Sequence, residues 1–355
     1  MQPPQEQPME AATPRVWRSI LWPTVILVVS IIAWFMVTYQ KTPSPDIPTP
    51  PHSSFDRRTA FYHSEITPLI QANAQSNREA AQRCLARIDD AFARYRQGIK
   101  PFGEDITSMG ARFGILVRMP SDWWYDDGRL EHYVQDKFET HLFSEDQLNT
   151  DLTHALTAFR DDLRANRNQL LALTKVAIQD RDFPGLSVPD YHSFDSKVNR
   201  QLVEFATGRA QDSVYHGIAT FVASEVAAVA GTQLLTRVVT SIGTSAATSV
   251  AAGGSAAASG AAAGAGAGTM AGPLGTAIGV GVGIVVGVMV DWWMTEQFQA
   301  ELENDLHQYL TKLRNGVIEG INGQPGLREL LSTFNDDLDQ AHRATMHHRL
   351  VGEYS

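Results

Sequence analysis

A glycine at every fourth position marks the apolar run 272–290, with Gly275, Gly279, Gly283 and Gly287 in register. The run carries no charged residue and approaches the ~20 residues that a helix needs to cross the apolar core of a bilayer. Because residues four apart lie on the same side of a helix, these glycines form one stripe. Such a stripe lets a second helix approach closely, as in the small-xxx-small contacts of membrane helices. The run therefore predicts tight helix–helix packing within or beside lipid.

The four-residue spacing of small residues extends upstream. It recurs at Gly260, Gly264, Gly268 and Gly272, and on an earlier segment at Ala219, Ala223, Ala227 and Gly231. Gly253-Gly254-Ser255 lies between the arms, which we place at about 213–252 and 256–290, and has the composition of a turn. We therefore predict that 217–293 forms a Gly/Ala-rich helical hairpin, a glycine zipper that packs through these small residues. Since each glycine costs ~1 kcal/mol relative to alanine in a helix, close packing, a membrane or both must offset that cost.

The two predicted arms differ in polarity. The second arm is apolar enough to span a bilayer, and Trp292 and Trp293 follow it as an interfacial girdle would. The first arm carries Glu225 and Arg237, which are costly in hydrocarbon unless they are paired or face an interior. Three arrangements follow: both arms in the membrane with Arg237 lining a polar seam or pore, the first arm in water within the bundle, or the second arm spanning alone.

Residues 17–40 contain a second apolar run, with the length of a transmembrane anchor. Trp17, Trp22 and Trp34 lie toward its ends, where the aromatic belts of membrane proteins sit. A cleaved signal peptide has a shorter apolar core and a small-residue cleavage site, so we expect an anchor that is retained. The preceding residues 1–16 are rich in Pro and Gln and are predicted to be disordered.

The residues that flank this anchor set the predicted topology. Arg15 and Arg18 precede it, and this basic bias favours a cytoplasmic N-terminus. The Pro-rich segment 41–54 is predicted to be a stiff spacer. We therefore expect a bacterial inner-membrane protein with the bulk of the chain in the periplasm.

Residues 55–216 carry almost no strand signal and predict an elongated extramembrane bundle of amphipathic helices. Pro68 is expected to begin the first helix and Gly98 to end it. Ser144 and Gln147 resemble a capping box at the start of the third. The spacing of apolar residues predicts helices over 69–97 and 129–143, another that follows Ser144, and a fourth that begins at Asp195.

The C-terminal segment 294–355 continues the helical pattern. A leucine stripe from Leu302 to Val317 predicts one helix, and the glycines within 320–326 are expected to break it. A last helix is predicted from Leu327 to Leu338, followed by a polar tail that contains His342, His347 and His348. The predicted fold class is thus all-α: an anchor, a helical bundle and a glycine-zipper hairpin.

Recognisable chemistry is sparse in this sequence. No Walker A, HExxH, CxxC or nucleophile-elbow pattern occurs, and the glycines at 266–271 follow no predicted strand, so we predict neither an enzyme nor a cofactor. His132, Asp136 and Glu139 share a helix face, but it lies away from the apolar stripe and is expected to be solvated, so no metal site is predicted. The single cysteine, Cys84, is expected to be a small buried hydrophobe. A net charge of −10 argues against nucleic acid as a partner.

These features leave two classes of function. In the first, the chain is a membrane-anchored helical scaffold or a subunit of an envelope complex, whose partners are the bilayer and either further copies of itself or other membrane-complex subunits. In the second, it forms a pore or channel after the hairpin enters the bilayer. Helical pore-forming toxins also combine a long bundle with an apolar hairpin, and the chain is similar to them in that general layout, with no shared residue motif.

Overall fold

The computed structural model describes residues 54–108, 129–179, 181, 190–208, 213–223, 273–292, 298–321 and 323–352. The chain divides into two compact units, Met1–Arg57 and Arg58–Ser355. The second unit contains nearly all of the described residues and is a bundle of helices, so the predicted all-α class is confirmed. The predicted anchor and its flanking segments, 1–16, 17–40 and most of 41–54, lie outside the described residues.

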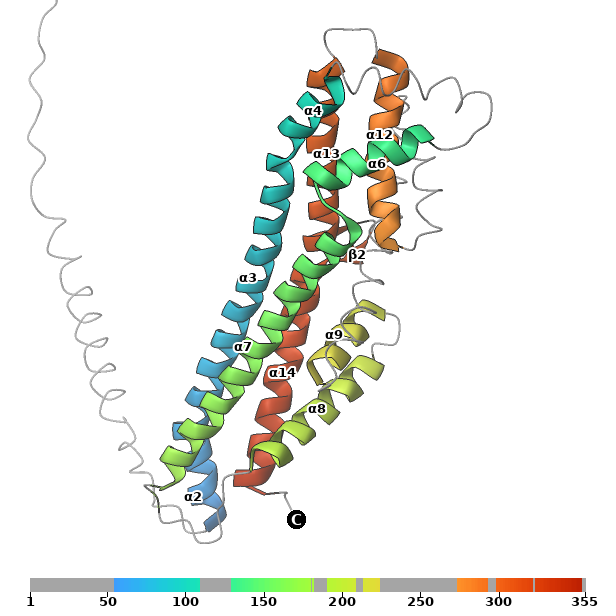
Figure 1. The fold of residues 1–355 in the computed structure, drawn as a ribbon. Coiled ribbons are helices and arrows are strands. Elements are labelled where there is room, and N and C mark those ends of the chain that lie inside the picture. Colours follow the sequence, from blue (N-terminus) through green and yellow to red (C-terminus); the bar gives the residue numbers. More distant parts are fainter. Residues whose placement is uncertain are drawn as a thin grey trace, which may run out of the picture. The chain divides into compact units, whose positions relative to one another are not determined.

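Three long helices form the centre of the bundle: α3 (Thr67–Gln97), α7 (Glu145–Gln179) and α14 (Leu327–Leu350). Both α7 and α14 pack against α3, and Figure 1 shows the three running alongside one another. Pro68 lies in the first turn of α3 and Gly98 caps its end, as predicted. The apolar stripe of α3 faces its partners and buries Ile70, Ala74, Ala81, Cys84, Leu85, Ile88, Phe92 and Tyr95.

Amide side chains connect the three central helices in what we call the asparagine network: the buried Asn73 and Asn77 of α3, the half-buried Asn166 of α7 and the buried Asn335 of α14. Asn77 donates to Asn73 Oδ1 over 3.2 Å and accepts from Asn166 Nδ2 over 2.9 Å. Asn73 donates to the Asn166 carbonyl oxygen over 2.8 Å, and Asn335 donates to the Asn77 carbonyl oxygen over 3.3 Å. Because a buried amide without a partner is costly, these bonds fix the register of the helices.

Side-chain caps explain where two of the helices begin. At α7, the Gln147 backbone N–H donates to Ser144 Oγ over 3.2 Å, which is one half of the predicted capping box. The next helix, α8 (Tyr191–Gly208), begins before the predicted start at Asp195. The reason is a cap further upstream, because Asp190 Oδ1 accepts the Ser193 backbone N–H over 3.0 Å.

Shorter helices adjoin the central three. Helix α2 (Ser54–Phe61) and the π-helical turn η1 (Tyr62–Ile66) precede α3, and α9 (Ser213–Ala223) packs against α8 and α14. Beyond the end of α3, α4 (Ile99–Thr107) and α6 (Arg129–His141) contact each other, and α12 (Pro273–Trp292) and α13 (Phe298–Ile318) pack with them. The segments 55–216, 217–293 and 294–355 thus all contribute helices to one unit.

A tight turn between α13 and α14 forms the predicted break at 320–326. Strands β1 (Gly320–Ile321) and β2 (Gln324–Pro325) pair antiparallel there, with Gly320 opposite Pro325. Gly320 has φ 93° and Gly323 has φ 77°, left-handed conformations that favour glycine.

The predicted polar tail after Leu338 is wrong. Helix α14 continues to Leu350, and His342 is buried within the bundle. The histidines in this stretch gave a polar pattern, but His342 and Met346 lie on the buried side of the helix, which α8 covers.

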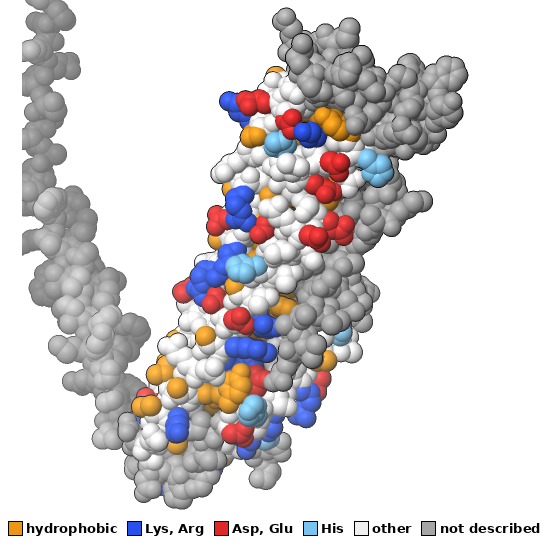
Figure 2. Space-filling model, viewed as in Figure 1, with side chains coloured by type: hydrophobic (Ala, Val, Ile, Leu, Met, Phe, Trp, Pro, Cys, Tyr) orange, Lys and Arg blue, Asp and Glu red, His pale blue; other side chains and the backbone are white. Residues whose placement is uncertain are grey.

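The described surface carries many charged side chains. In the space-filling view, side chains of both signs are interspersed along the visible face (Figure 2). Several form pairs between helices, such as Arg83 with Asp162 and Arg94 with Asp151, each at 3.0 Å. Among the residues that the structure describes, no helix has the length and hydropathy needed to cross a membrane.

Candidate functional site

The glycine-rich helix α12 packs chiefly against α6 and α13, and also touches α7. Its apolar side chains are buried around most of its circumference: Ala277, Ile278, Val280, Val282, Ile284, Val285, Val288 and Met289. Gly283 and Gly287 of the predicted stripe are buried as well. Among residues 277–289 of α12, the least buried are Gly279 and Val286, which are seven residues apart and therefore share one narrow side of the helix.

A close fit around α12 occurs at Gly281. A Cβ placed there would lie 2.6 Å from Phe138 Cζ of α6 and 3.2 Å from Tyr309 Cε1 of α13. Any side chain at this position would therefore collide with an aromatic ring. We call the contact of Phe138, Tyr309, Ala277 and Gly281 the α12 packing site.

A buried hydrogen bond completes the α12 packing site. The Tyr309 hydroxyl donates to the carbonyl oxygen of Ala277, which joins α13 to α12. Burial raises the pKa of Tyr309, so its phenol stays protonated and remains a donor. The described side chains of α12 are apolar, so the acceptor of this bond is a backbone oxygen of the helix.

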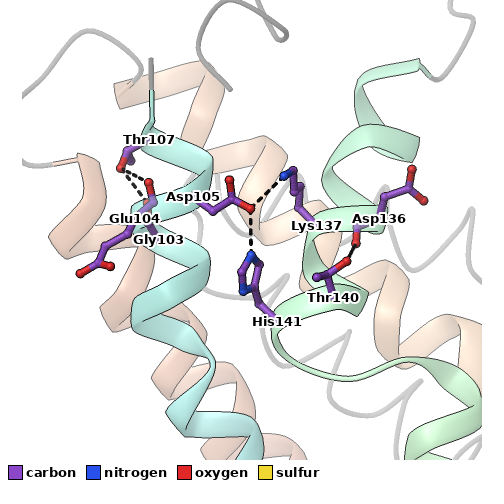
Figure 3. Close-up of polar contacts among 8 residues, drawn as sticks. All are labelled: Gly103, Glu104, Asp105, Thr107, Asp136, Lys137, Thr140 and His141. Atoms are coloured by element: carbon purple, nitrogen blue, oxygen red, sulfur yellow. Dashed lines mark hydrogen bonds and ion pairs between the residues drawn. The ribbon is translucent and has the colours of Figure 1, made fainter. Parts of the chain in front are cut away.

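An ion cluster fixes α6, which carries Phe138, to α4. Asp105 of α4 accepts hydrogen bonds from Lys137 Nζ over 2.9 Å and from His141 Nε2 over 2.8 Å. Figure 3 shows Lys137 and His141, one turn apart on α6, both pointing toward Asp105. These two bonds lower the pKa of Asp105 below its usual value, and the Asp105 carboxylate raises the pKa of Lys137.

Aromatic contacts extend from this cluster toward α12. The Phe102 ring of α4 meets the Phe138 ring edge to face with centroids 6.2 Å apart, and Phe143 lies 5.3 Å from Phe138 on the way into α7. Phe138 itself is fully buried. The ion cluster and the rings together set the position from which Phe138 reaches Gly281.

The described parts of the predicted hairpin have different main neighbours. Ala219 is buried in α9 and Ala223 is half-buried at its end, but α9 packs chiefly against α8 and α14, not against α12. Gly275 and Trp292 belong to α12. The remaining predicted contact or interface residues lie outside the described residues: Ala227, Gly231, Gly260, Gly264, Gly268, Gly272, Trp17, Trp22, Trp34 and Trp293. The roles of the packing face and of the interface tryptophans therefore stay predictions.

Sequence reasoning missed Gly281 because it does not belong to the four-residue repeat. The available signal was the alternation Gly279-Val280-Gly281-Val282-Gly283, which places an extra glycine off the stripe. What that glycine accommodates depends on Phe138 and Tyr309, which are far away in the sequence. Phe138 lies within the helix predicted over 129–143, but its partner was not predictable from periodicity.

The described residues include the candidates for metal binding and for thiol reactivity. No group of three or more His, Cys, Asp or Glu side chains among them is placed to hold a metal ion. His132 and Asp136 are exposed and Glu139 is half-buried on α6. Cys84 is buried, as predicted, and its burial raises the pKa of the thiol to about 12, so it is a poor nucleophile.

Comparison of the chain with models of known protein families, with curated proteins and with solved structures finds no match. No residue role can therefore be transferred from a relative. The α12 packing site and the helices that hold it are the features from which function has to be inferred.

Proposed function

We propose that this protein is a non-enzymatic, membrane-anchored helical scaffold or a subunit of an envelope membrane complex. Residues 17–40 would hold it in the inner membrane, with its bulk in the periplasm. The observation that carries the proposal is the α12 packing site, where a glycine-rich apolar helix is fixed between α6 and α13 of a rigid bundle. A helix held in this way presents one side to a partner while its other sides are used within the chain.

The long central helices support a spacing role. Helix α3 has 31 residues and α7 has 35, which corresponds to about 45 to 55 Å at a rise of about 1.5 Å per residue. The asparagine network holds their register, and cross-helix ion pairs such as Arg314 with Asp89, at 2.6 Å, connect α13 to α3. The bundle therefore keeps the α12 packing site at a fixed distance from η1, which immediately precedes α3.

The side of α12 at Gly279 and Val286 supports oligomerisation through Gly279, one residue of the predicted stripe, whereas Gly283 and Gly287 of that stripe are buried within the chain. These two residues are half-buried, whereas the neighbouring apolar side chains are covered by other helices. A small residue at Gly279 allows a second helix to approach closely. We therefore place the subunit contact on this side, with a second copy or another membrane-complex subunit as the partner.

Pore formation is the second candidate, and the packing of α12 weighs against it. For α12 to enter a bilayer, it would have to leave Phe138 and Tyr309 and give up the hydrogen bond at the Ala277 carbonyl oxygen. Those contacts are what hold it as part of the bundle. We therefore favour the scaffold.

The proposal is tested by the mass of the full chain in detergent, measured by native mass spectrometry or light scattering. We expect wild type to form a defined oligomer and Gly279→Leu to dissociate it, because the added side chain fills the contact. Gly208→Leu, which adds the same side chain at an exposed glycine of α8 with nothing within 4 Å of an added Cβ, serves as the control and is expected to leave the oligomer intact. A wild type that is monomeric, or a Gly279→Leu oligomer as stable as the control, would exclude oligomerisation through this side of α12.

A further inference from the structure

Helices α8 and α9 form a docked pair on one part of the bundle. They contact each other and both contact α14, and Figure 1 shows them side by side next to it. Their docking uses polar groups: Asp195 of α8 pairs with Arg167 of α7, and the Tyr215 hydroxyl of α9 donates to Asp337 of α14. The docking of α8 and α9 therefore depends on charged side chains, whereas the asparagine network consists of neutral amides.

His342 of α14 lies under α8. Only 1% of it is exposed, and its ring stacks on Phe194 of α8 with centroids 5.7 Å apart. Its Nε2 has no hydrogen-bond partner among the described residues. The guanidinium of Arg167, itself 2% exposed, is the nearby charge that acts on the ring.

The charged and titratable groups of this region come from α7, α8, α9, η1 and α14 itself. Helix α7 contributes Arg167, whose charge is engaged by Asp195 of α8. In η1, Tyr62 donates to the Arg343 carbonyl oxygen over 3.3 Å, and on α9 Tyr215 engages Asp337. On α14 itself, Asp339 and Arg343 pair with each other at 2.9 Å. No carboxylate in this set hydrogen-bonds His342, so a proton on the imidazole would add a second buried cation beside Arg167.

We propose that α8 and α9 are an acid-releasable pair: proton uptake by His342 opposes their docking on α7 and α14, so mild acid frees them from the bundle. Lifting α8 removes Phe194 from the imidazole and admits water to it. Release also exposes the buried faces of α8 and α9, including Ala219 at the start of the predicted first arm. The inference goes beyond scaffolding, because it gives the bundle a segment that responds to pH.

The direction of the effect follows from proton linkage. Burial and the charge of Arg167 lower the pKa of docked His342 to about 3, whereas a solvated histidine titrates near ~6.5. The proton therefore prefers the released state. Docking is at full strength above about pH 6.5 and weakens as the pH falls from there toward about 3. At pH 5 the ratio of released to docked molecules rises about 30-fold, since each pH unit below ~6.5 contributes a factor of about ten.

Hydrogen exchange of the full chain, read by mass spectrometry at pH 7.5 and pH 5.0 and corrected for the intrinsic rate, tests this. We expect protection in α8 and α9 to fall about 30-fold at pH 5.0, while α3 keeps its protection. His342→Gln, which cannot take up the proton, is expected to abolish the difference. His132→Gln removes an exposed histidine of α6 and is expected to respond as wild type does.

Two outcomes would overturn the inference. Loss of protection in α3 together with α8 would mean that acid unfolds the bundle as a whole. An undiminished acid response in His342→Gln would mean that another group takes up the proton. If His342→Gln fails to fold, His342→Phe keeps a flat ring against Phe194 and provides the same comparison.

Discussion

The asparagine network and the α12 packing site hold helices together in opposite ways. In the network, Asn77 and its neighbours join α3, α7 and α14 through directional hydrogen bonds of buried and half-buried amides. At the α12 packing site, the fit comes from shape, because Gly281 leaves room for the rings of Phe138 and Tyr309. The first device specifies which residues are level with each other along the bundle. The second specifies how close two backbones come, and it tolerates almost no change in volume.

The largest effect that separates the two devices is expected from Phe138→Ala. Removing a fully buried ring that contacts α4, Phe143 and α12 leaves a cavity, and such changes cost about 3 to 5 kcal/mol of the free energy of unfolding. Urea unfolding of the full chain, followed by circular dichroism, measures it. Leu173→Ala on the exposed side of α7 is the control and is expected to cost little. Equal losses in the two variants would contradict the packing of Phe138.

A smaller loss is expected in the asparagine network. Asn77→Ala leaves the Asn166 amide and the Asn73 side-chain oxygen without their partner, and an unsatisfied buried polar group costs about 1 to 3 kcal/mol. Gln75→Ala, two residues away and exposed, is the matched control. The same urea titration compares them. A loss no greater than that of the control would show that Asn77 does not set the register.

The smallest effect is expected at the ion cluster between α4 and α6. Asp105 and Lys137 are about one-third exposed (30% and 32%), so solvent screens their attraction, and Asp105→Asn is expected to cost less than about 1 kcal/mol. Because the pKa of Asp105 is lowered in the folded protein, its contribution is present above the ordinary carboxyl pKa and is lost as the pH falls through the lowered value. The loss is also expected to shrink in high salt. A cost above that of Asn77→Ala, unchanged by salt, would contradict this ranking.

Local signals were enough to predict many of the helices. Pro68 and Gly98 bound α3 because proline suits a first turn and glycine an end, and Ser144 begins α7 through its cap. The leucine stripe of α13 is buried from Leu302 to Val317, as its spacing predicts. These features depend on residues that are close in the sequence.

The features that were missed depend on distant partners. His342 is a polar residue in a polar stretch, and only the approach of Phe194 from α8 makes it a buried one. Gly281 is one glycine among many, and only Phe138 and Tyr309 distinguish it. Periodicity in the sequence indicates which face of a helix is buried. It does not indicate which aromatic ring or charged group from another helix will contact that face.

The most direct test of the scaffold account is a double-mutant cycle of Phe138→Ala and Gly281→Ala, measured by urea unfolding of the full chain. Gly281→Ala alone is expected to cost about 1 to 3 kcal/mol, because its methyl group overlaps the Phe138 ring. In the Phe138→Ala background that overlap with the ring is gone, so the same change is expected to cost much less, with a coupling energy of about 0.5 to 3 kcal/mol. Additivity within about 0.5 kcal/mol would mean that α6 and α12 do not touch, and would contradict the packing of the glycine-rich helix within the bundle.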